Sequence, residues 1–244
     1  MFSERRELKV LLVIGIFVIQ QLTSKFAGFI ANLFNYNTID KDGVFAWISV
    51  HHIIQLLVGL VIIIFLSRKL NLDFNLKIGN IKIGVKYILI FSSIMFIYVI
   101  LTYISGYYFN KIAPYNYKLN TKNIICTLGF QFFLSGTSEE ILFRALPITL
   151  LIFIFGTNKK ISIKTWNIPL EIIISALFFS IAHISWSLYP FIINLDLFQL
   201  VYAFVLGIAY GYAYMRSQSI VYPILMHSIS NVLMVGIGYI FVSL

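Results

Sequence analysis

Seven long apolar runs dominate this chain and restrict it to one kind of fold. Inside a bilayer every backbone N–H and C=O must be paired within the protein, so only helices and closed barrels can span it. A helix needs about 20 apolar residues to cross roughly 30 Å of hydrocarbon. The predicted spans are residues 9–33, 44–66, 83–109, 124–155, 168–187, 196–215 and 220–243. We therefore predict an all-α, polytopic transmembrane helix bundle of seven to eight helices.

The composition supports a membrane protein and argues against a soluble one. Of 244 residues, 60% are hydrophobic and only 11% are charged, whereas soluble domains carry about 25% charged residues. The stretches between the apolar runs are too short to fold alone, so we expect one membrane-embedded unit. The lone Cys126 excludes an internal disulfide. The first run is too long for a signal peptide, and we expect it to be retained.

The net charge of +9 predicts an orientation in the membrane rather than a nucleic-acid partner. Basic residues gather in four places along the chain: Arg5, Arg6, Lys9, Arg68, Lys69, Lys77, Lys82, Lys86, Lys159, Lys160, Lys164 and Arg216. Since cytoplasmic loops are rich in Lys and Arg, we expect the N-terminus inside and the C-terminus outside. Three lysines just before the fourth run oppose this trend. Abundant Ile, Asn, Lys and Tyr favour a bacterial gene, and hence a multi-pass protein of the bacterial cytoplasmic membrane.

Three charged side chains lie inside the fourth apolar run, in Gly136–Arg144, which reads GTSEEILFR. A charge at the bilayer centre costs about 2.5–3.5 kcal/mol on insertion scales, so such residues face a protein interior or a wet cavity and mark function. Glu140 and Arg144 are four residues apart on one helical face and predict a structural ion pair. Glu139 points elsewhere, and a carboxylate in a cavity suits a general base.

The fourth run is too long for a simple crossing, since residues 124–155 would form a helix of about 48 Å. Gly136 is a candidate break in that helix. Thr137, three residues before Glu140, fits a capping box. We therefore predict a helix that restarts near residue 138 and carries both glutamates in its first turn.

Histidine and asparagine side chains interrupt two later runs. His183 lies near the end of the fifth run, while His227 and Asn231, four residues apart, share one face of the last. Each alone fits ordinary hydrogen bonding between helices, but together with Glu139 they predict a buried polar site. A shared site requires similar depths, and the run 168–187 places His183 too far toward the outer side unless that helix is broken or displaced.

The adjacent His51 and His52 interrupt the second run. Neighbouring side chains on a helix point about 100° apart, so these two rings cannot readily share one ligand. Two interpretations stay open. They are polar side chains near the interface or against a neighbouring helix, or they take part in the site.

These polar motifs together resemble the CPBP family, the group of intramembrane proteases that includes CAAX proteases and bacteriocin-processing or Abi proteins. The family pattern is EExxxR, FxxxH and HxxxN on three separate helices. The matching residues here are Glu139, Glu140, Arg144, Phe179, His183, His227 and Asn231. The resemblance covers about residues 122–240, which it implies form a CPBP/Abi-type catalytic membrane core, while residues 1–110 match only as generic N-terminal transmembrane helices.

The resemblance also implies roles for these residues. Glu139 and His183 would activate a water to attack a peptide carbonyl. His227 and Asn231 would stabilise the oxyanion, as donors aimed at developing charge do. The remaining pair, Glu140 and Arg144, would hold the helix.

A metal is the open question for this set. The likeness favours a glutamate-type site without a cofactor. However, one glutamate and two histidines are also a zinc ligand set, so Glu139, His183 and His227 remain candidates for a divalent metal.

Three classes of function compete for this chain. The resemblance favours an intramembrane endopeptidase that acts on a membrane-associated peptide or membrane protein. The alternative is a non-catalytic bacteriocin self-immunity or regulatory protein of the same family that binds a partner in the membrane. An ion or proton transporter also uses buried Glu and His but predicts matching broken helices in two halves, and we expect a break in one half only. The oligomeric state is left open.

Overall fold

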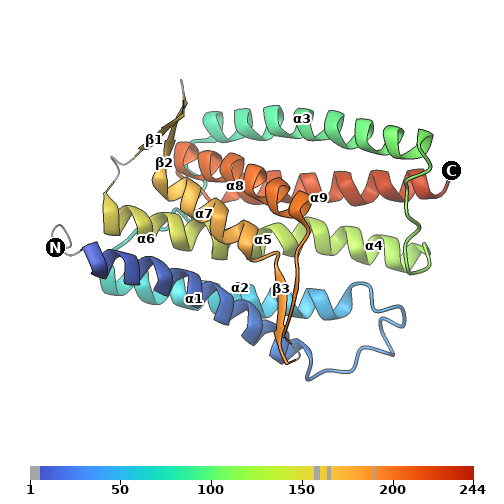
Figure 1. Cartoon of the computed structure of the whole chain (residues 1–244), viewed down its shortest axis with the longest axis horizontal. Coiled ribbons are helices and arrows are strands. Elements are labelled where there is room, and N and C mark those ends of the chain that lie inside the picture. The colour runs from blue at the N-terminus through green and yellow to red at the C-terminus, as the bar shows by residue number, and fades with distance from the viewer. Residues whose placement is uncertain (1–5, 157–159, 164–165, 190) are drawn as a thin grey trace.

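The structure is a computed structural model that describes residues 6–156, 160–163, 166–189 and 191–244. Within these ranges the chain is mostly helical, with two short β-hairpins (Figure 1). The helices are α1 (Arg6–Ala31), α2 (Ala46–Leu70), α3 (Ile81–Tyr108), α4 (Thr121–Phe130), α5 (Gly136–Glu140), α6 (Leu146–Phe155), α7 (Leu170–Ile181), α8 (Leu197–Ser217) and α9 (Val221–Val242). The predicted all-α transmembrane bundle is confirmed.

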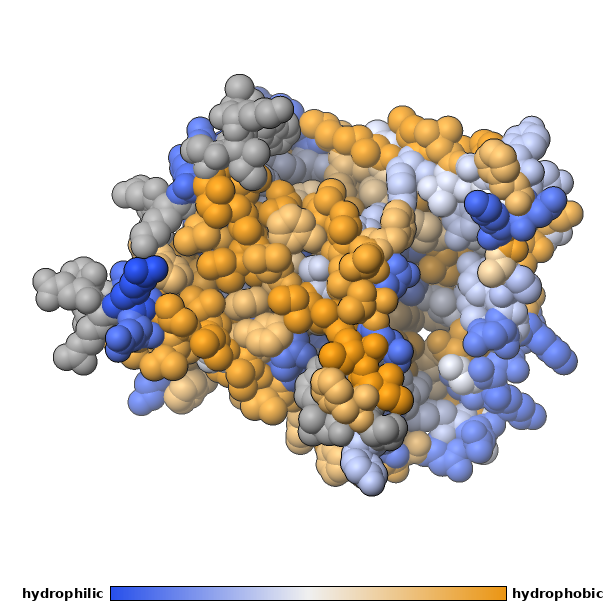
Figure 2. Space-filling model, in the orientation of Figure 1, coloured by the Kyte–Doolittle hydropathy of each residue, from blue (hydrophilic) through white to orange (hydrophobic). Residues whose placement is uncertain are grey.

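Long apolar helices run side by side along the longest axis of the molecule (Figure 1). Of the helices described, α1, α2, α3, α8 and α9 are long and apolar enough to cross a membrane. Figure 2 shows apolar side chains over much of the flank of the bundle and hydrophilic ones gathered mainly toward its two ends. This distribution matches a bilayer that surrounds the flank, and the protein is a multi-pass membrane protein.

The fourth apolar run forms one uninterrupted helical rod. Two π-helical turns, η1 (Gln131–Ser135) and η2 (Ile141–Ala145), join α4, α5 and α6. The predicted break is wrong, because Gly136 keeps right-handed helical angles (φ −59°, ψ −39°). The predicted capping box is also absent, since Thr137 Oγ1 donates to the Phe133 carbonyl one turn earlier, at 2.7 Å.

Gly136 allows α9 to approach the rod closely. A Cβ atom at this position would lie 2.7 Å from Ser228 Oγ and 3.0 Å from the Ile224 carbonyl oxygen. Both atoms belong to α9, which also carries His227. A residue that the sequence suggests as a helix breaker is therefore a point of close helix packing.

Neighbouring helices satisfy carbonyls in the π turn η2. A π turn disturbs the regular i→i+4 ladder, and such turns occur frequently at functional sites. Gln20 of α1 donates from Nε2 to the Leu142 carbonyl at 2.8 Å. Ser175 of α7 donates to the Phe143 carbonyl at 2.5 Å. Because buried backbone groups must be paired, these contacts fix the rod where it carries its charged residues.

Helix α7 is shorter than the predicted span 168–187. Its 12 residues extend only about 18 Å, and the chain then turns at His183 and forms an antiparallel hairpin of β3 (Ser185–Leu188) and β4 (Phe191–Asn194). Another hairpin, of β1 (Lys160–Ile163) and β2 (Trp166–Pro169), precedes α7. The chain therefore turns back partway, which brings His183 to the depth of the other polar residues.

The loop before α2 is organised by one buried carboxylate. Asp40 Oδ2 accepts hydrogen bonds from the backbone N–H groups of Phe45 and Ala46, both at 2.7 Å, and Oδ1 accepts from Val44 at 3.0 Å. Burial alone would raise the pKa of Asp40, but these backbone donors outweigh it and lower the pKa below its usual value. The ionised carboxylate therefore stabilises the fold above its ordinary pKa, and this stabilisation is lost as the pH falls through the lowered value.

We expect Asp40→Asn to destabilise the protein by about 1–2 kcal/mol at neutral pH. The deficit should shrink as acid protonates the wild-type carboxylate. Thermal unfolding of both proteins across a pH series in one detergent measures this. Glu7→Gln, on the exposed first turn of α1, is the control and should change stability by less than about 0.5 kcal/mol. An Asp40→Asn deficit that stays constant down to strong acid contradicts the argument.

Candidate active site

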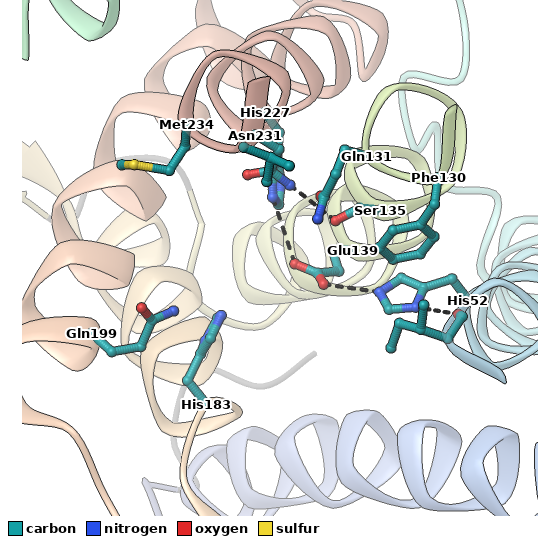
Figure 3. A pocket seen from close by; sticks show the side chains of 12 residues that line it. His52, Phe130, Gln131, Ser135, Glu139, His183, Gln199, His227, Asn231 and Met234 are labelled. Atoms are coloured by element: carbon teal, nitrogen blue, oxygen red, sulfur yellow. Dashed lines mark hydrogen bonds and ion pairs between the residues drawn. The ribbon is translucent and has the colours of Figure 1, made fainter. Parts of the chain in front are cut away.

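The four residues predicted as catalytic line a single cavity of about 320 Å³ (Figure 3). Glu139 comes from α5, His183 from the turn after α7, and His227 and Asn231 from α9. Their side chains gather where three helical segments meet near the middle of the bundle. The difference in depth expected between His183 and His227 is absent because α7 ends early.

Glu139 extends into this cavity between two imidazole rings (Figure 3). Its side chain is 20% exposed. Oε1 lies 3.1 Å from His52 Nε2, and Oε2 lies 3.7 Å from His227 Nε2. The second distance is too long for a direct hydrogen bond, so Oε2 is the oxygen with room for a water or a substrate atom.

The predicted ion pair between Glu140 and Arg144 is present and fully buried. Arg144 Nε lies 3.2 Å from Glu140 Oε2, both side chains are 0% exposed, and these two atoms form an ion pair without an aligned hydrogen bond. The guanidinium also lies over the Phe179 ring, 4.3 Å from its centroid. Such a pair stabilises the π turn η2 between the two residues, since separating buried charges is costly.

Glu140 also fixes the ring of His227. Its Oε1 lies 2.9 Å from His227 Nδ1, and a carboxylate accepts a hydrogen bond, so Nδ1 carries the proton. Tyr210 stacks on the same ring with centroids 5.2 Å apart and planes 16° apart. The Nε2 edge of His227 is therefore held toward Glu139.

His183 has its other nitrogen free for chemistry. Nδ1 lies 2.8 Å from the Phe179 carbonyl oxygen, which can only accept, so this nitrogen bears the hydrogen. In the neutral ring Nε2 then carries the lone pair. The ring is half-buried and lies across the cavity from Glu139 (Figure 3). It can accept a hydrogen bond from a water there.

Asn231 supplies an amide to the same wall of the cavity. Its Nδ2 donates to Ser135 Oγ of η1 at 3.0 Å. This bond ties α9 to the π turn that precedes Glu139. The amide lies one turn beyond His227, so both side chains border the space in front of the carboxylate (Figure 3).

His52 is the site residue that the sequence left between two interpretations. Its ring lines the cavity and contacts Glu139, although it lies 87 positions away in the chain. The sequence signal that could have indicated this contact is the spacing of His52 and Gln55, since two polar residues three apart share one face of the helix. Both are buried, and Gln55 donates to Ser138 Oγ at 3.4 Å. His51 points elsewhere, with its Nε2 3.5 Å from Ser24 Oγ.

The metal site considered for Glu139, His183 and His227 stays a prediction. Among the described residues, no three His, Cys, Asp or Glu side chains are grouped so as to hold a metal ion. The contacts of His227 Nδ1 to Glu140 and of Glu139 Oε1 to His52 leave His227 Nε2 and Glu139 Oε2 facing the cavity.

Comparison with known proteins links this site to a family of proteases. Residues 121–233 match the family model described as type II CAAX prenyl endopeptidase Rce1-like. No curated protein and no solved structure matches the chain. The matched segment runs from the start of α4 into α9 and includes all four predicted catalytic residues, whereas α2 and His52 lie outside it.

Proposed function

We propose that this chain is an endopeptidase of the Rce1-like, CAAX-type intramembrane proteases, whose family model matches residues 121–233, and that its Glu139 and His183 activate a water. The observation that carries this proposal is the meeting of a carboxylate, two imidazoles and an amide in one cavity inside the bundle. The substrate would be a membrane-associated peptide or a segment of a membrane protein that reaches the cavity from the bilayer.

The proposed reaction begins with a water held between Glu139 and His183. Glu139 takes one proton from this water as its oxygen adds to the carbonyl carbon of the peptide bond. His183 Nε2 accepts a hydrogen bond from the other O–H group of the water and so orients the water. When the C–N bond breaks, the proton held by Glu139 passes to the departing amine nitrogen. No covalent enzyme intermediate is needed.

The carbonyl oxygen gains negative charge during this attack and needs hydrogen-bond donors. The Asn231 amide and the Nε2 edge of His227 border the space in front of Glu139, and His227 would donate from Nε2 when that nitrogen carries a hydrogen. Donors preorganised in a water-poor site are worth several kcal/mol at the transition state. Glu140 and Arg144 would not react, but they keep the rod and the His227 ring in register.

No step of this reaction uses a metal. We therefore expect the purified protein to keep its activity after prolonged treatment with 1,10-phenanthroline and dialysis. The measurement is the rate of peptide cleavage before and after treatment, with a zinc protease in the same detergent as the positive control. Loss of cleavage that added zinc restores would show a metal-dependent reaction and overturn this part of the proposal.

A Glu139→Gln variant tests the function and identifies the substrate in one experiment. Membranes from cells that make the wild type or the variant are compared by quantitative proteomics. The proposal expects a precursor to accumulate with the variant and a shorter product to appear with the wild type. If the biological effect persists in the variant without any uncleaved precursor, the protein acts by binding, as a self-immunity or regulatory protein would.

We propose that the N-terminus lies in the cytoplasm of a bacterial cell. The start of α1, the end of α2 and the start of α3 lie at one end of the bundle, and the C-terminus lies at the other (Figure 1). The first of these ends carries Arg68, Lys69, Lys82 and Lys86, as the excess of cytoplasmic positive charge predicts. Arg5, Lys159 and Lys164 lie outside the described residues. Labelling single cysteines placed at either end in intact cells tests the orientation.

A further inference from the structure

His52 makes the closest contact to the carboxylate of Glu139 among the residues described. Its Nε2 lies 3.1 Å from Oε1, compared with 3.7 Å between His227 Nε2 and Oε2. The His52 side chain is 8% exposed and lines the same cavity. Because α2 lies outside the segment that matches the protease family, the N-terminal half of the chain provides this contact to Glu139.

The contact between His52 and Glu139 has to contain a proton. His52 Nδ1 lies 2.9 Å from the Ile48 carbonyl oxygen, which can only accept, so Nδ1 bears a hydrogen. A bare Nε2 facing a bare carboxylate oxygen at 3.1 Å would bring two lone pairs together. A hydrogen therefore lies between Nε2 and Oε1, and the proposed role of Glu139 as a base requires that His52 holds it and donates it to the carboxylate.

The His52 ring is itself held rigidly. The bond to Ile48, one turn earlier on α2, sets the orientation of the ring. Phe130 packs edge-on against it, with centroids 4.9 Å apart and planes 83° apart. Because Ile48 and Phe130 hold the ring, His52 can orient the Glu139 carboxylate that is bonded to its Nε2.

The hydrogen bond between His52 and Glu139 determines which oxygen of Glu139 faces the substrate. With Oε1 bonded to His52, rotation of the carboxylate about its last bond is restricted. Oε2 is left toward the cavity, beside His227 (Figure 3). Among the described residues, the bond to His52 is the only hydrogen bond that this carboxylate makes. Without it, the base would be free to turn away from the attacking water.

We propose that His52 is a positioning residue that holds Glu139 by Oε1 and presents Oε2 to the water. The inference rests on the proposed role of Glu139 as the base. It means that α2 completes the catalytic unit, so the N-terminal helices contribute to the reaction as well as to the fold. Displacing a catalytic group by about 1 Å can cost on the order of 10²-fold in rate.

The experiment compares three variants of the full-length protein in one detergent or lipid. His52→Ala removes the bond, and we expect kcat to fall about 10- to 100-fold with KM within about twofold. His52→Gln retains a nitrogen that can donate to Oε1, and we expect it to recover most of kcat. His51→Ala is the control for loss of a neighbouring imidazole. This ring contacts the rings of Trp47 and His52, with centroids 5.3 and 5.2 Å apart, and its Nε2 lies 3.5 Å from Ser24 Oγ, so we expect His51→Ala to lower kcat far less than His52→Ala.

Kinetics and thermal unfolding of each variant separate positioning from structure. A kcat that is lost with Ala and recovered with Gln at similar unfolding temperatures supports the inference. Wild-type kcat in His52→Ala, or equal losses in Ala and Gln, overturns it. If His52→Ala is not recovered folded, His52→Leu, which fills similar space without a nitrogen, takes its place. An inactive Glu139→Gln beside a fully active His52→Ala refutes this inference alone, whereas an active Glu139→Gln refutes the proposed function and this inference with it.

Discussion

Replacing Glu139 by glutamine is expected to lower kcat/KM by about 10²–10⁴-fold, the contribution typical of a general base. Glutamine has nearly the same shape and can still hydrogen-bond to His52, but it cannot take a proton from water. KM should change little, since the side chain meets the substrate mainly through the attacking water. The measurement is the initial rate of peptide cleavage by purified wild type and variant reconstituted into the same lipid.

Two controls keep this result interpretable. Glu7→Gln makes the same chemical change at an exposed position on α1 and should leave the rate unaltered. Equal unfolding temperatures for wild type and Glu139→Gln would show that the fold is intact, as expected for a side chain that is 20% exposed. Near-normal cleavage by a folded Glu139→Gln protein would remove this carboxylate from the reaction and refute the proposed mechanism.

The helices of this protein could be predicted from sequence because length and hydropathy determine a membrane span locally. The helices α1, α2, α3, α8 and α9 all lie within a few residues of apolar runs. The short α7 could not be predicted in this way. Its apolar run continues past Ile181 to Ile184, so hydropathy alone does not show that the helix ends and the chain turns into a hairpin.

Local spacing also explains which parts of the site were predictable. The pair Glu140 and Arg144, and the pair His227 and Asn231, are each four residues apart, and a helix places such residues on one face whatever surrounds it. The role of His52 depends instead on how α2 packs against a rod far away in sequence, which no local pattern reveals. Gly136 was misinterpreted for the same reason, since its value lies in the approach of α9.

Replacing Arg144 by alanine is expected to destabilise the protein by about 3–5 kcal/mol. The guanidinium is the cation paired with Glu140, and both side chains are 0% exposed. Removing it leaves the Glu140 carboxylate buried and hydrogen-bonded to His227 without its paired cation. The loss also removes the cation that lies over the Phe179 ring, so packing between the rod and α7 weakens as well.

A second substitution distinguishes an uncompensated charge from lost packing. Adding Glu140→Gln to Arg144→Ala removes the buried negative charge and keeps an oxygen for His227 Nδ1, so we expect the double variant to regain part of the lost stability. The free energies of unfolding of the wild type, Arg144→Ala and the double variant are measured by reversible unfolding in mixed micelles. Arg216→Ala, at an exposed position near the end of α8, is the control and should differ from wild type by less than about 0.5 kcal/mol. If the double variant is less stable than Arg144→Ala, the hydrogen bond from His227 to Glu140 stabilises the fold more than the unpaired charge destabilises it. The structural role would then belong to that hydrogen bond instead of the ion pair.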